Sequence, residues 1–388
     1  MLNNDKNNKR TLCFIVSSRI TVQAFLIPHI KELEDSYNIT VVANIVSGED
    51  IEGIPGVRLI PLVIERKINF ISDLFALINL YKIFKRERFD IIHSVTPKAG
   101  LLAMLAGYFS RTPIRVHTFT GQVWATKGGI KRILFRFFDK VIARAATNIL
   151  VDSKSQREFL LDEGVVSENK SKVLLSGSIC GVDIERFSQD KQARASIRNE
   201  LGISDHSIVF LYLGRLSRDK GILDLVHAFS DLSGKYKDIH LVIIGPDEDN
   251  LQAEIVKIGA NSKKKIHLMG YTDIPQEYMA AADIFCLPSY REGFGNVIIE
   301  AASTGIPAIG CNIYGVKDAI QEGITGLLYE PRNINELESK MQTLIDDPDL
   351  RKRMGKKASE YTRKNFNEHD VVIAQKGYYE ELQGNPPQ

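Results

Sequence analysis

The sequence has little of what marks membrane-spanning, exported or metal-binding proteins. Only four cysteines and one tryptophan occur among its 388 residues, and no two cysteines have the Cys-x-x-Cys spacing of zinc or redox sites. Its longest nearly uncharged apolar stretches, such as Leu101–Phe109, are far shorter than the roughly 20 residues that span a bilayer. The Asn- and Lys-rich start, Met1–Arg10, does not resemble a signal peptide. We therefore expect a cytoplasmic protein with buried thiols.

Two common nucleotide-binding fingerprints are also missing. A dinucleotide-dependent dehydrogenase needs Gly-x-Gly-x-x-Gly after its first strand, and Val16–Ile20 lacks it. The P-loop order Gly-x-x-x-x-Gly-Lys-Ser/Thr is absent as well. No known nucleic-acid module and no stripe of interleaved basic and aromatic residues occurs. These absences disfavour a dehydrogenase, a P-loop enzyme and a nucleic-acid partner.

The formal net charge of +2 conceals an asymmetry between the two halves of the chain. Residues 1–185 contain 25 Lys and Arg against 19 Asp and Glu, a net charge of +6, so the remainder carries −4. A basic first half favours an anionic partner, such as a membrane surface or a phosphorylated acceptor. Scattered, solvated charge is the simpler alternative, and the composition does not decide between them.

Short apolar runs alternate with amphipathic helical stretches along the whole chain, which predicts parallel α/β layers. Because 388 residues exceed one average hydrophobic core, we expect two doubly wound, Rossmann-like domains. We place the first domain at 1–183, a linker at 184–206, the second domain at 207–357, and at 358–388 a helix that could return to the first domain. Ligands of such sheets bind beyond the carboxyl ends of the strands, so the interdomain cleft is the predicted site.

The most informative loop is Leu213–Gly221, with the sequence LGRLSRDKG. A predicted strand ends at its start, and a helix is expected to begin near Ile222. Arg215 and Lys220 bracket the loop, and together with the positive helix N-terminus they could hold a diphosphate. Charged strand-to-helix turns are also common without any ligand, so this loop alone leaves phosphate binding open.

A second strand-to-helix stretch, Leu287–Glu300, reads LPSYREGFGNVIIE. Its two carboxylates, Glu292 and Glu300, suit a sugar because each carboxylate can accept two hydroxyl hydrogen bonds. Gly293 and Gly295 would let the backbone approach a ligand closely. A solvated acidic helix start, favoured by the helix dipole, is the alternative for such a pair of glutamates taken by itself.

Together the two stretches resemble the retaining glycosyltransferases of family 4, which have the GT-B fold. The resemblance rests on Gly-Arg…Lys-Gly, followed about seventy residues later by Pro-Ser…Glu-Gly-Phe-Gly…Glu, and on the Glu-x7-Glu spacing of Glu292 and Glu300. It is dense over residues 180–330 and extends to the rest of the chain by architecture only. It implies two doubly wound domains that face an interdomain cleft.

The resemblance implies a role for each matched residue on the donor side. Arg215 and Lys220 would hold the donor diphosphate and offset the charge on the leaving group, so neither a metal nor another cofactor is expected. Glu300 would bind the ribose hydroxyls, and Glu292 would bind hydroxyls of the transferred sugar. The backbone of four residues would lie near sugar and phosphate: Gly293, Phe294, Gly295 and Asn296.

In the first half, the stretch VHTFTG places His117 near the end of a predicted strand. The resemblance implies that His117, with Glu292, lies close to the reacting centre. A buried, hydrogen-bonded core histidine is the alternative. Many relatives have Gly-Gly after the first strand where this chain has Ser17 and Ser18, which makes these serines acceptor-side candidates. Lys98, at the start of a predicted helix, is a third candidate and could meet an acceptor phosphate.

Residues 127–144, KGGIKRILFRFFDKVIAR, contain six cations and one acid. Four of the cations recur every four residues and form a basic stripe, with apolar residues on another face. This pattern is typical of a helix that lies on an anionic membrane. A helix that packs its apolar face on the domain core would show the same pattern, so both interpretations stay open.

The expected function is transfer of a hexose or N-acetylhexosamine from a nucleotide-diphosphate sugar, most simply a UDP-sugar, with retention of configuration. The run Thr118–Trp124 is similar to bacterial members that extend polyprenyl-diphosphate-linked sugars, so a lipid-linked saccharide in polysaccharide or glycan assembly is the expected acceptor. A peripheral position at the inner face of the cytoplasmic membrane would suit it. A sugar-nucleotide epimerase or hydrolase of the same fold is the nearest alternative.

Overall fold

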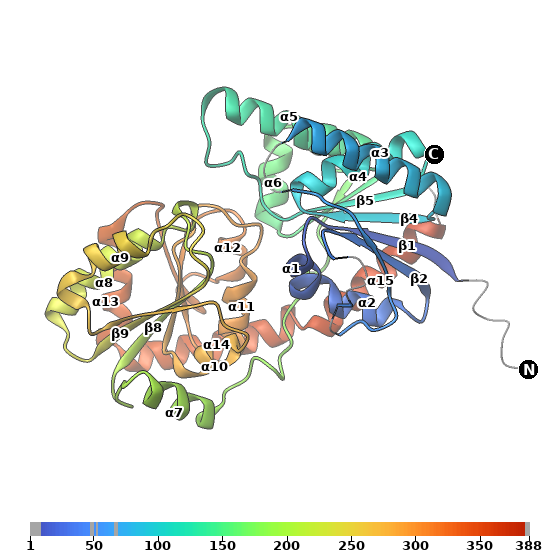
Figure 1. Cartoon of the computed structure of the whole chain (residues 1–388). Helices are drawn as coiled ribbons and strands as arrows, with labels where there is room; N and C mark the ends of the chain where they lie inside the picture. Colours follow the sequence, from blue (N-terminus) through green and yellow to red (C-terminus); the bar gives the residue numbers. More distant parts are fainter. Residues whose placement is uncertain (1–8, 47–49, 52, 66–68, 385–388) are drawn as a thin grey trace, which may run out of the picture. The chain divides into compact units, whose positions relative to one another are not determined.

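The structure is a computed structural model that describes residues 9–46, 50–51, 53–65 and 69–384 (Figure 1). The chain divides into two compact units. Unit 1 consists of Met1–Cys180 and Glu368–Gln388, and unit 2 consists of Gly181–Asn367. Among the described residues, none of the helices combines the length and hydrophobicity that crossing a bilayer requires. All four cysteines are buried.

Unit 1 is built on a seven-stranded parallel sheet with the order β3-β2-β1-β4-β5-β6-β7. Its strands are β1 (Arg10–Ile15), β2 (Tyr37–Ala43), β3 (Arg58–Pro61), β4 (Ile91–Val95), β5 (Ile114–Phe119), β6 (Asn148–Val151) and β7 (Ser171–Lys172). Its helices are α1 (Arg19–Thr21), a π-helical segment (Val22–Leu26), α2 (Ile27–Leu33), α3 (Phe70–Glu87), α4 (Pro97–Ser110), α5 (Gly129–Ala145), α6 (Lys154–Asp162) and α15 (Glu368–Gly384).

Helices cover both faces of the unit 1 sheet, which explains why its central strands read as continuous apolar runs. Side chains alternate along β1: Leu12 and Phe14 pack with α2 and α15, whereas Cys13 and Ile15 pack with α3, α4 and α5. The helix α4 packs between α3 and α5, and Figure 1 shows these three helices together on one face. The sheet is therefore enclosed between two helical layers.

Unit 2 has a six-stranded parallel sheet with the order β10-β9-β8-β11-β12-β13. Its strands are β8 (Ile208–Leu213), β9 (Ile239–Ile244), β10 (Ile266–Gly270), β11 (Ile284–Leu287), β12 (Ala308–Cys311) and β13 (Gly326–Tyr329). Its α-helices are α7 (Lys191–Glu200), α8 (Ile222–Lys235), α9 (Gln252–Ile258), α10 (Pro275–Ala281), α11 (Asn296–Ser303), α12 (Val316–Ala319), α13 (Ile334–Asp346) and α14 (Pro348–Asn365). Two short 3₁₀ segments are Arg218–Lys220 and Ala260–Ser262.

Both sheets reverse their strand order next to the first strand, between β1 and β4 in unit 1 and between β8 and β11 in unit 2. The loops that follow two such strands lead to helices on opposite faces, which leaves a crevice at the carboxyl edge of the sheet. The predicted fold class, two doubly wound Rossmann-like domains, is confirmed. The two reversal points are where ligand-binding residues are expected.

The domain boundaries differ from those we predicted. Residues 184–206, expected to be a linker, lie within unit 2 and contain α7, which packs against α10. Arg194 of α7 donates hydrogen bonds to carbonyl oxygens at the end of α10 and pairs with Asp283 at 2.8 Å. Within 358–388, the boundary between the two units falls after Asn367, so α14 lies in unit 2 and α15 lies in unit 1. A charged amphipathic segment looked like a linker because its buried partners are distant in sequence.

Candidate active site

The two loops singled out in the sequence lie on the two sides of the unit 2 reversal point. One loop follows β8 and the other follows β11, and because these strands are parallel neighbours both loops start from the same edge of the sheet. The ammonium group of Lys220 in the first loop donates to a carboxylate oxygen of Glu292 in the second at 2.6 Å. Both side chains are about 15% exposed. The predicted cationic loop and acidic turn thus contact each other directly.

A second ion pair, together with a backbone hydrogen bond, holds the same two loops together. Arg291 pairs with Asp219 at 2.6 Å, and the backbone N–H of Tyr290 donates to the carbonyl oxygen of Asp219 at 2.9 Å. Burial alone would raise the pKa of Asp219, but the hydrogen bond from Ser217 and the charge of Arg291 lower this pKa to about 2. Asp219 is therefore ionised at neutral pH and joins the loops.

Gly221 ends the first loop where it lies against the second. Its φ is +64°, and a Cβ atom added there would lie 2.1 Å from the carbonyl oxygen of Pro288. A side chain would therefore both strain the backbone and push the loops apart. This close backbone approach fixes the distance between the loops, and only glycine permits it.

We expect Gly221→Ala to lower the free energy of unfolding by about 2 kcal/mol or more, because the left-handed backbone and the collision with Pro288 both cost free energy. Urea denaturation measures this change in the free energy of unfolding. Gly234→Ala in α8 is the matched control, since nothing lies within 4 Å of the added Cβ. That control should be neutral or stabilising by up to about 1 kcal/mol. Equal stability of the two variants would contradict the assigned role of Gly221.

Arg215, the other predicted diphosphate cation, forms an ion pair with Glu248. About a third of each side chain is exposed, so this pair is more accessible than the pair between Lys220 and Glu292. The phenol of Tyr212 donates to the carbonyl oxygen of Arg215 at 2.7 Å and holds the backbone at the start of the loop. Each predicted diphosphate cation thus already has a carboxylate partner within unit 2.

Glu300, the predicted ribose ligand, lies in α11 and is partly buried. Burial raises the pKa of its carboxyl group to about 7, and the charge of Arg186 opposes this rise. A carboxyl group with such a pKa can accept hydrogen bonds when ionised and donate one when protonated. The preceding residues, Gly293 to Asn296, lead into the first turn of α11. These roles stay predictions.

In unit 1, His117 lies near the carboxyl end of β5 and is 1% exposed. Its Nδ1 is 2.8 Å from the hydroxyl oxygen of Ser94, whereas its Nε2 is buried with no hydrogen-bond partner in the described part of the chain. A Cβ atom at Gly100 would lie 2.3 Å from the imidazole, so this glycine makes room for the ring. Burial lowers the pKa of His117 to about 3, so the imidazole is neutral. One of its two ring nitrogens thus has no hydrogen-bond partner among the described residues.

The acceptor-side candidates lie at the unit 1 reversal point. Ser17 accepts a hydrogen bond from the hydroxyl of Thr96 at 3.3 Å, and Ser18 caps α1 by accepting from the N–H of Thr21. Lys98 pairs with Asp73 of α3 at 2.6 Å, a contact that sequence reasoning missed because the two residues lie on different helices. Ser17 and Ser18 follow β1 and Lys98 follows β4, so the reversal point brings the three candidates to one edge of the sheet.

Sequence reasoning also missed buried polar side chains that follow the carboxyl ends of β5 and β6. Gln156 donates to Gln122 at 3.1 Å, and both side chains are fully buried. Burial raises the pKa of Asp152, just beyond the end of β6, to about 8. Gln122 follows the stretch that contains His117, so its position in the sequence was a usable signal. Asp152 and Gln156 carried no such signal.

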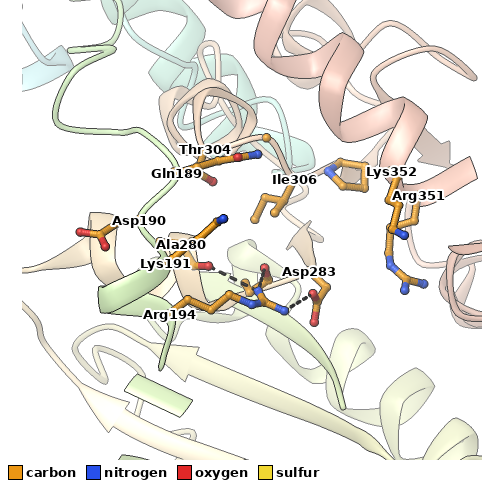
Figure 2. A pocket seen from close by; sticks show the side chains of 13 residues that line it. Gln189, Asp190, Lys191, Arg194, Ala280, Asp283, Thr304, Ile306, Arg351 and Lys352 are labelled. Carbon is orange, nitrogen blue, oxygen red and sulfur yellow. Dashed lines mark hydrogen bonds and ion pairs between the residues drawn. The ribbon is translucent and has the colours of Figure 1, made fainter. Parts of the chain in front are cut away.

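A cavity of about 330 Å³ in unit 2 is separate from these loops. It is lined by α7, the end of α10, the start of α14 and the segments before β11 and β12 (Figure 2). Those segments lie at the amino edge of the sheet, opposite to the edge with Lys220 and Glu292. Figure 2 shows that Arg194 on its wall is engaged by Asp283. This cavity is therefore a gap in the helix packing and not part of the candidate site.

Comparisons with known proteins agree with this geometry. Residues 193–361 match the family profile for glycosyl transferases group 1, and residues 26–185 match that for Glycosyltransferase Family 4. The chain is 30% identical over 311 residues to the capsular polysaccharide biosynthesis glycosyltransferase CapM of Staphylococcus aureus, covering 80% of this chain and 81% of CapM. It is also 30% identical over 292 residues to the Escherichia coli UDP-Gal:α-D-GlcNAc-diphosphoundecaprenol α-1,3-galactosyltransferase, covering 73% of each chain.

Solved structures show the same architecture. The crystal structure of Anabaena HepE with UDP and glucose superimposes with a TM-score of 0.79 at 18% identity, covering 96% of this chain and 99% of that one. At this identity the likeness shows the fold. The two family profiles and the similarity to CapM show the family, and the two reversal points agree with the fold of HepE. The chain is therefore a member of the family 4 glycosyltransferases and has their GT-B fold.

Proposed function

We propose that this glycosyltransferase transfers a hexose or N-acetylhexosamine from a UDP-sugar to a lipid-linked saccharide, with retention of anomeric configuration. The observation that carries the donor proposal is the contact between Lys220 and Glu292 at the unit 2 reversal point. It places a cation suited to a diphosphate beside a carboxylate suited to sugar hydroxyls. UDP in the crystal structure of HepE, which has the same fold, supports the choice of nucleotide.

The charges of unit 2 suggest how its residues would act on the donor. Lys220 and Arg215 would bind the diphosphate and stabilise the negative charge that develops on the departing UDP, without a metal. Glu292 would accept hydrogen bonds from hydroxyls of the sugar once Lys220 turns towards the phosphates. Glu300 would accept hydrogen bonds from the ribose hydroxyls. Neutral His117 of unit 1 would bind the sugar through Nε2, the nitrogen that has no partner among the described residues.

The acceptor proposal is supported by the relatives and by the charge of the chain. The name of the E. coli relative specifies a sugar linked to diphosphoundecaprenol, and CapM is named for capsular polysaccharide biosynthesis. We extend this acceptor class, a polyprenyl-diphosphate-linked saccharide, to the present chain. Such an acceptor lies in a membrane, so we also propose a peripheral position at its cytoplasmic face, with residues 127–144 near the anionic surface.

The test is a transfer assay with purified protein, a panel of UDP- and GDP-sugars and undecaprenyl-diphosphate-linked N-acetylglucosamine. We expect a UDP-sugar to yield a lipid-linked disaccharide, and NMR of the product to show that the anomeric configuration of the donor is retained. Consumption of the UDP-sugar at the same rate without the acceptor would instead support the hydrolase or epimerase alternative. A product of inverted configuration would overturn the retaining assignment.

A further inference from the structure

The outer face of α3 is unusually apolar for a surface helix. Ile71, Leu74, Phe75 and Ile78 recur with the i, i+3, i+4, i+7 spacing of one helix face, and they are between 40 and 72% exposed. The opposite face packs into the core through Ala76, Leu80 and Phe84. A surface helix normally presents polar residues to water, and a contiguous exposed apolar patch marks an interaction site.

The same face becomes cationic in the last turns of α3. Lys82 and Lys85 continue the spacing from Ile78, and both are exposed. Just beyond them, a cavity of about 360 Å³ lies between the carboxyl ends of α3 and α4, and its lining includes Lys85, Arg88 and Arg111. No acidic side chain lines this cavity, and none of its three cations has an ion-pair partner in the described part of the chain.

The neighbouring helix α5 also has exposed apolar residues, but it has fewer unpaired cations beside them than its basic stripe suggests. Its Ile133 and Phe137 are exposed, so the first half of α5 does not pack its apolar face on the core. However, two members of its basic stripe, Arg132 and Arg136, both pair with Glu163. The stripe predicted from the sequence is therefore partly neutralised. Arg86 of α3 pairs with Glu87, but Lys82, Lys85 and Arg88 have no ion-pair partner among the described residues, which makes α3 the better match for an anionic surface.

We propose that the outer face of α3 docks on an anionic lipid bilayer. Its apolar side chains enter the boundary between head groups and acyl chains, Lys82 contacts the lipid phosphates, and the cavity lined by Lys85, Arg88 and Arg111 binds a lipid phosphate. About two turns of apolar surface that continue into unpaired cations match the layering of a bilayer, in which the apolar region lies beneath anionic head groups. The proposal rests on the proposed function, because a lipid-linked acceptor would be reached from this surface.

Vesicle sedimentation tests the apolar part of the surface. With phosphatidylcholine vesicles that contain phosphatidylglycerol, we expect Ile71→Ser/Leu74→Ser/Phe75→Ser to lower the partition coefficient by about tenfold or more, because three side chains no longer enter the bilayer. The matched control is Val256→Ser/Ile324→Ser in unit 2, which removes two half-exposed apolar side chains elsewhere and should bind as the unchanged protein does. Equal vesicle binding by the α3 variant would overturn the proposal.

A second variant tests the cavity. Each cation near an anionic bilayer is worth about fivefold in binding, so Lys85→Gln/Arg88→Asn/Arg111→Asn should weaken binding to the anionic vesicles on the order of a hundredfold. Asn suits positions 88 and 111 because both have a positive φ at a helix end. Binding to pure phosphatidylcholine should not change. Unaltered binding to anionic vesicles would remove the cavity from the membrane surface.

The remaining controls separate this proposal from the proposed function and from self-association. Both α3 variants should keep the UDP-dependent rise in melting temperature and the transfer rate to a water-soluble acceptor analogue, because they lie outside the donor site. Failure of the unchanged protein to bind UDP would overturn the proposed function while leaving the vesicle result valid. Sedimentation velocity of the unchanged protein should show a monomer. A dimer that the triple serine variant dissociates, with no vesicle binding, would assign the face to a second copy.

Discussion

Glu292→Gln is expected to lower the rate of sugar transfer by about a hundredfold or more while UDP binds as well as before, or more tightly. The amide has about the same size as the carboxylate but no charge and only one acceptor oxygen, so the hydroxyls of the transferred sugar lose a charge-assisted acceptor, and loss of one transition-state contact typically costs this much. The same change removes the ion-pair partner of Lys220, whose ammonium group is then available to the diphosphate. Initial rates and UDP titration calorimetry measure the two effects.

Unit 2 contains a matched control for this substitution. Glu338 pairs with Lys235 at 2.8 Å, so Glu338→Gln breaks the same type of ion pair away from the two loops. The control should transfer sugar at the wild-type rate. A Glu292→Gln protein with wild-type transfer would remove this carboxylate from the sugar site, and one that no longer binds UDP would show that the ion pair is needed to form the donor site.

Lys220→Ala is expected to have the opposite effect on the nucleotide and to weaken UDP binding by about tenfold or more. A hydrogen bond to a charged group contributes about 1.5–3 kcal/mol. The substitution also leaves the carboxylate of Glu292, which is 15% exposed, without its cation beside the diphosphate. Like charges would then repel each other, so the loss should exceed that for Arg215→Ala, whose ion pair is more exposed.

The double variant makes this prediction specific. Because Glu292→Gln removes the repelling charge, Lys220→Ala/Glu292→Gln should recover part of the UDP affinity that Lys220→Ala loses. Lys235→Ala, which breaks the control pair with Glu338, should leave UDP affinity unchanged. Additive effects of the two substitutions would mean that their contact has no part in donor binding, and full affinity of Lys220→Ala would contradict the diphosphate assignment.

The strands that frame the candidate site were predictable because buried parallel strands are short apolar runs. Ile208–Leu213 and Ile284–Leu287 were located to the residue, and so were the loops that follow them. The edge strands β3 and β7 were not foreseen, since each is short and includes exposed polar residues. The helix α7 was mistaken for part of a linker because Arg194 and Arg198, which look solvated in the sequence, are held by Asp283.

For charged residues too, the sequence indicated where they lie on a helix but not which partners they have. Lys98 was a candidate to meet an acceptor phosphate, and the structure pairs it with Asp73. A membrane was one of the two interpretations left open for the basic stripe of α5, and two of its arginines pair with Glu163. Hydrophobic periodicity describes one helix at a time, so it shows which side chains share a face. It does not show what lies opposite that face.

By itself, the sequence determined that this protein has two parallel α/β sheets and where the loops after β8 and β11 begin, because strand patterns and turn residues are local properties. Only the tertiary structure decided which charges meet. Lys220 and Glu292 are 72 residues apart and touch because β8 and β11 are neighbours in the sheet. Strand order sets which loops are adjacent, and it depends on packing across the whole unit.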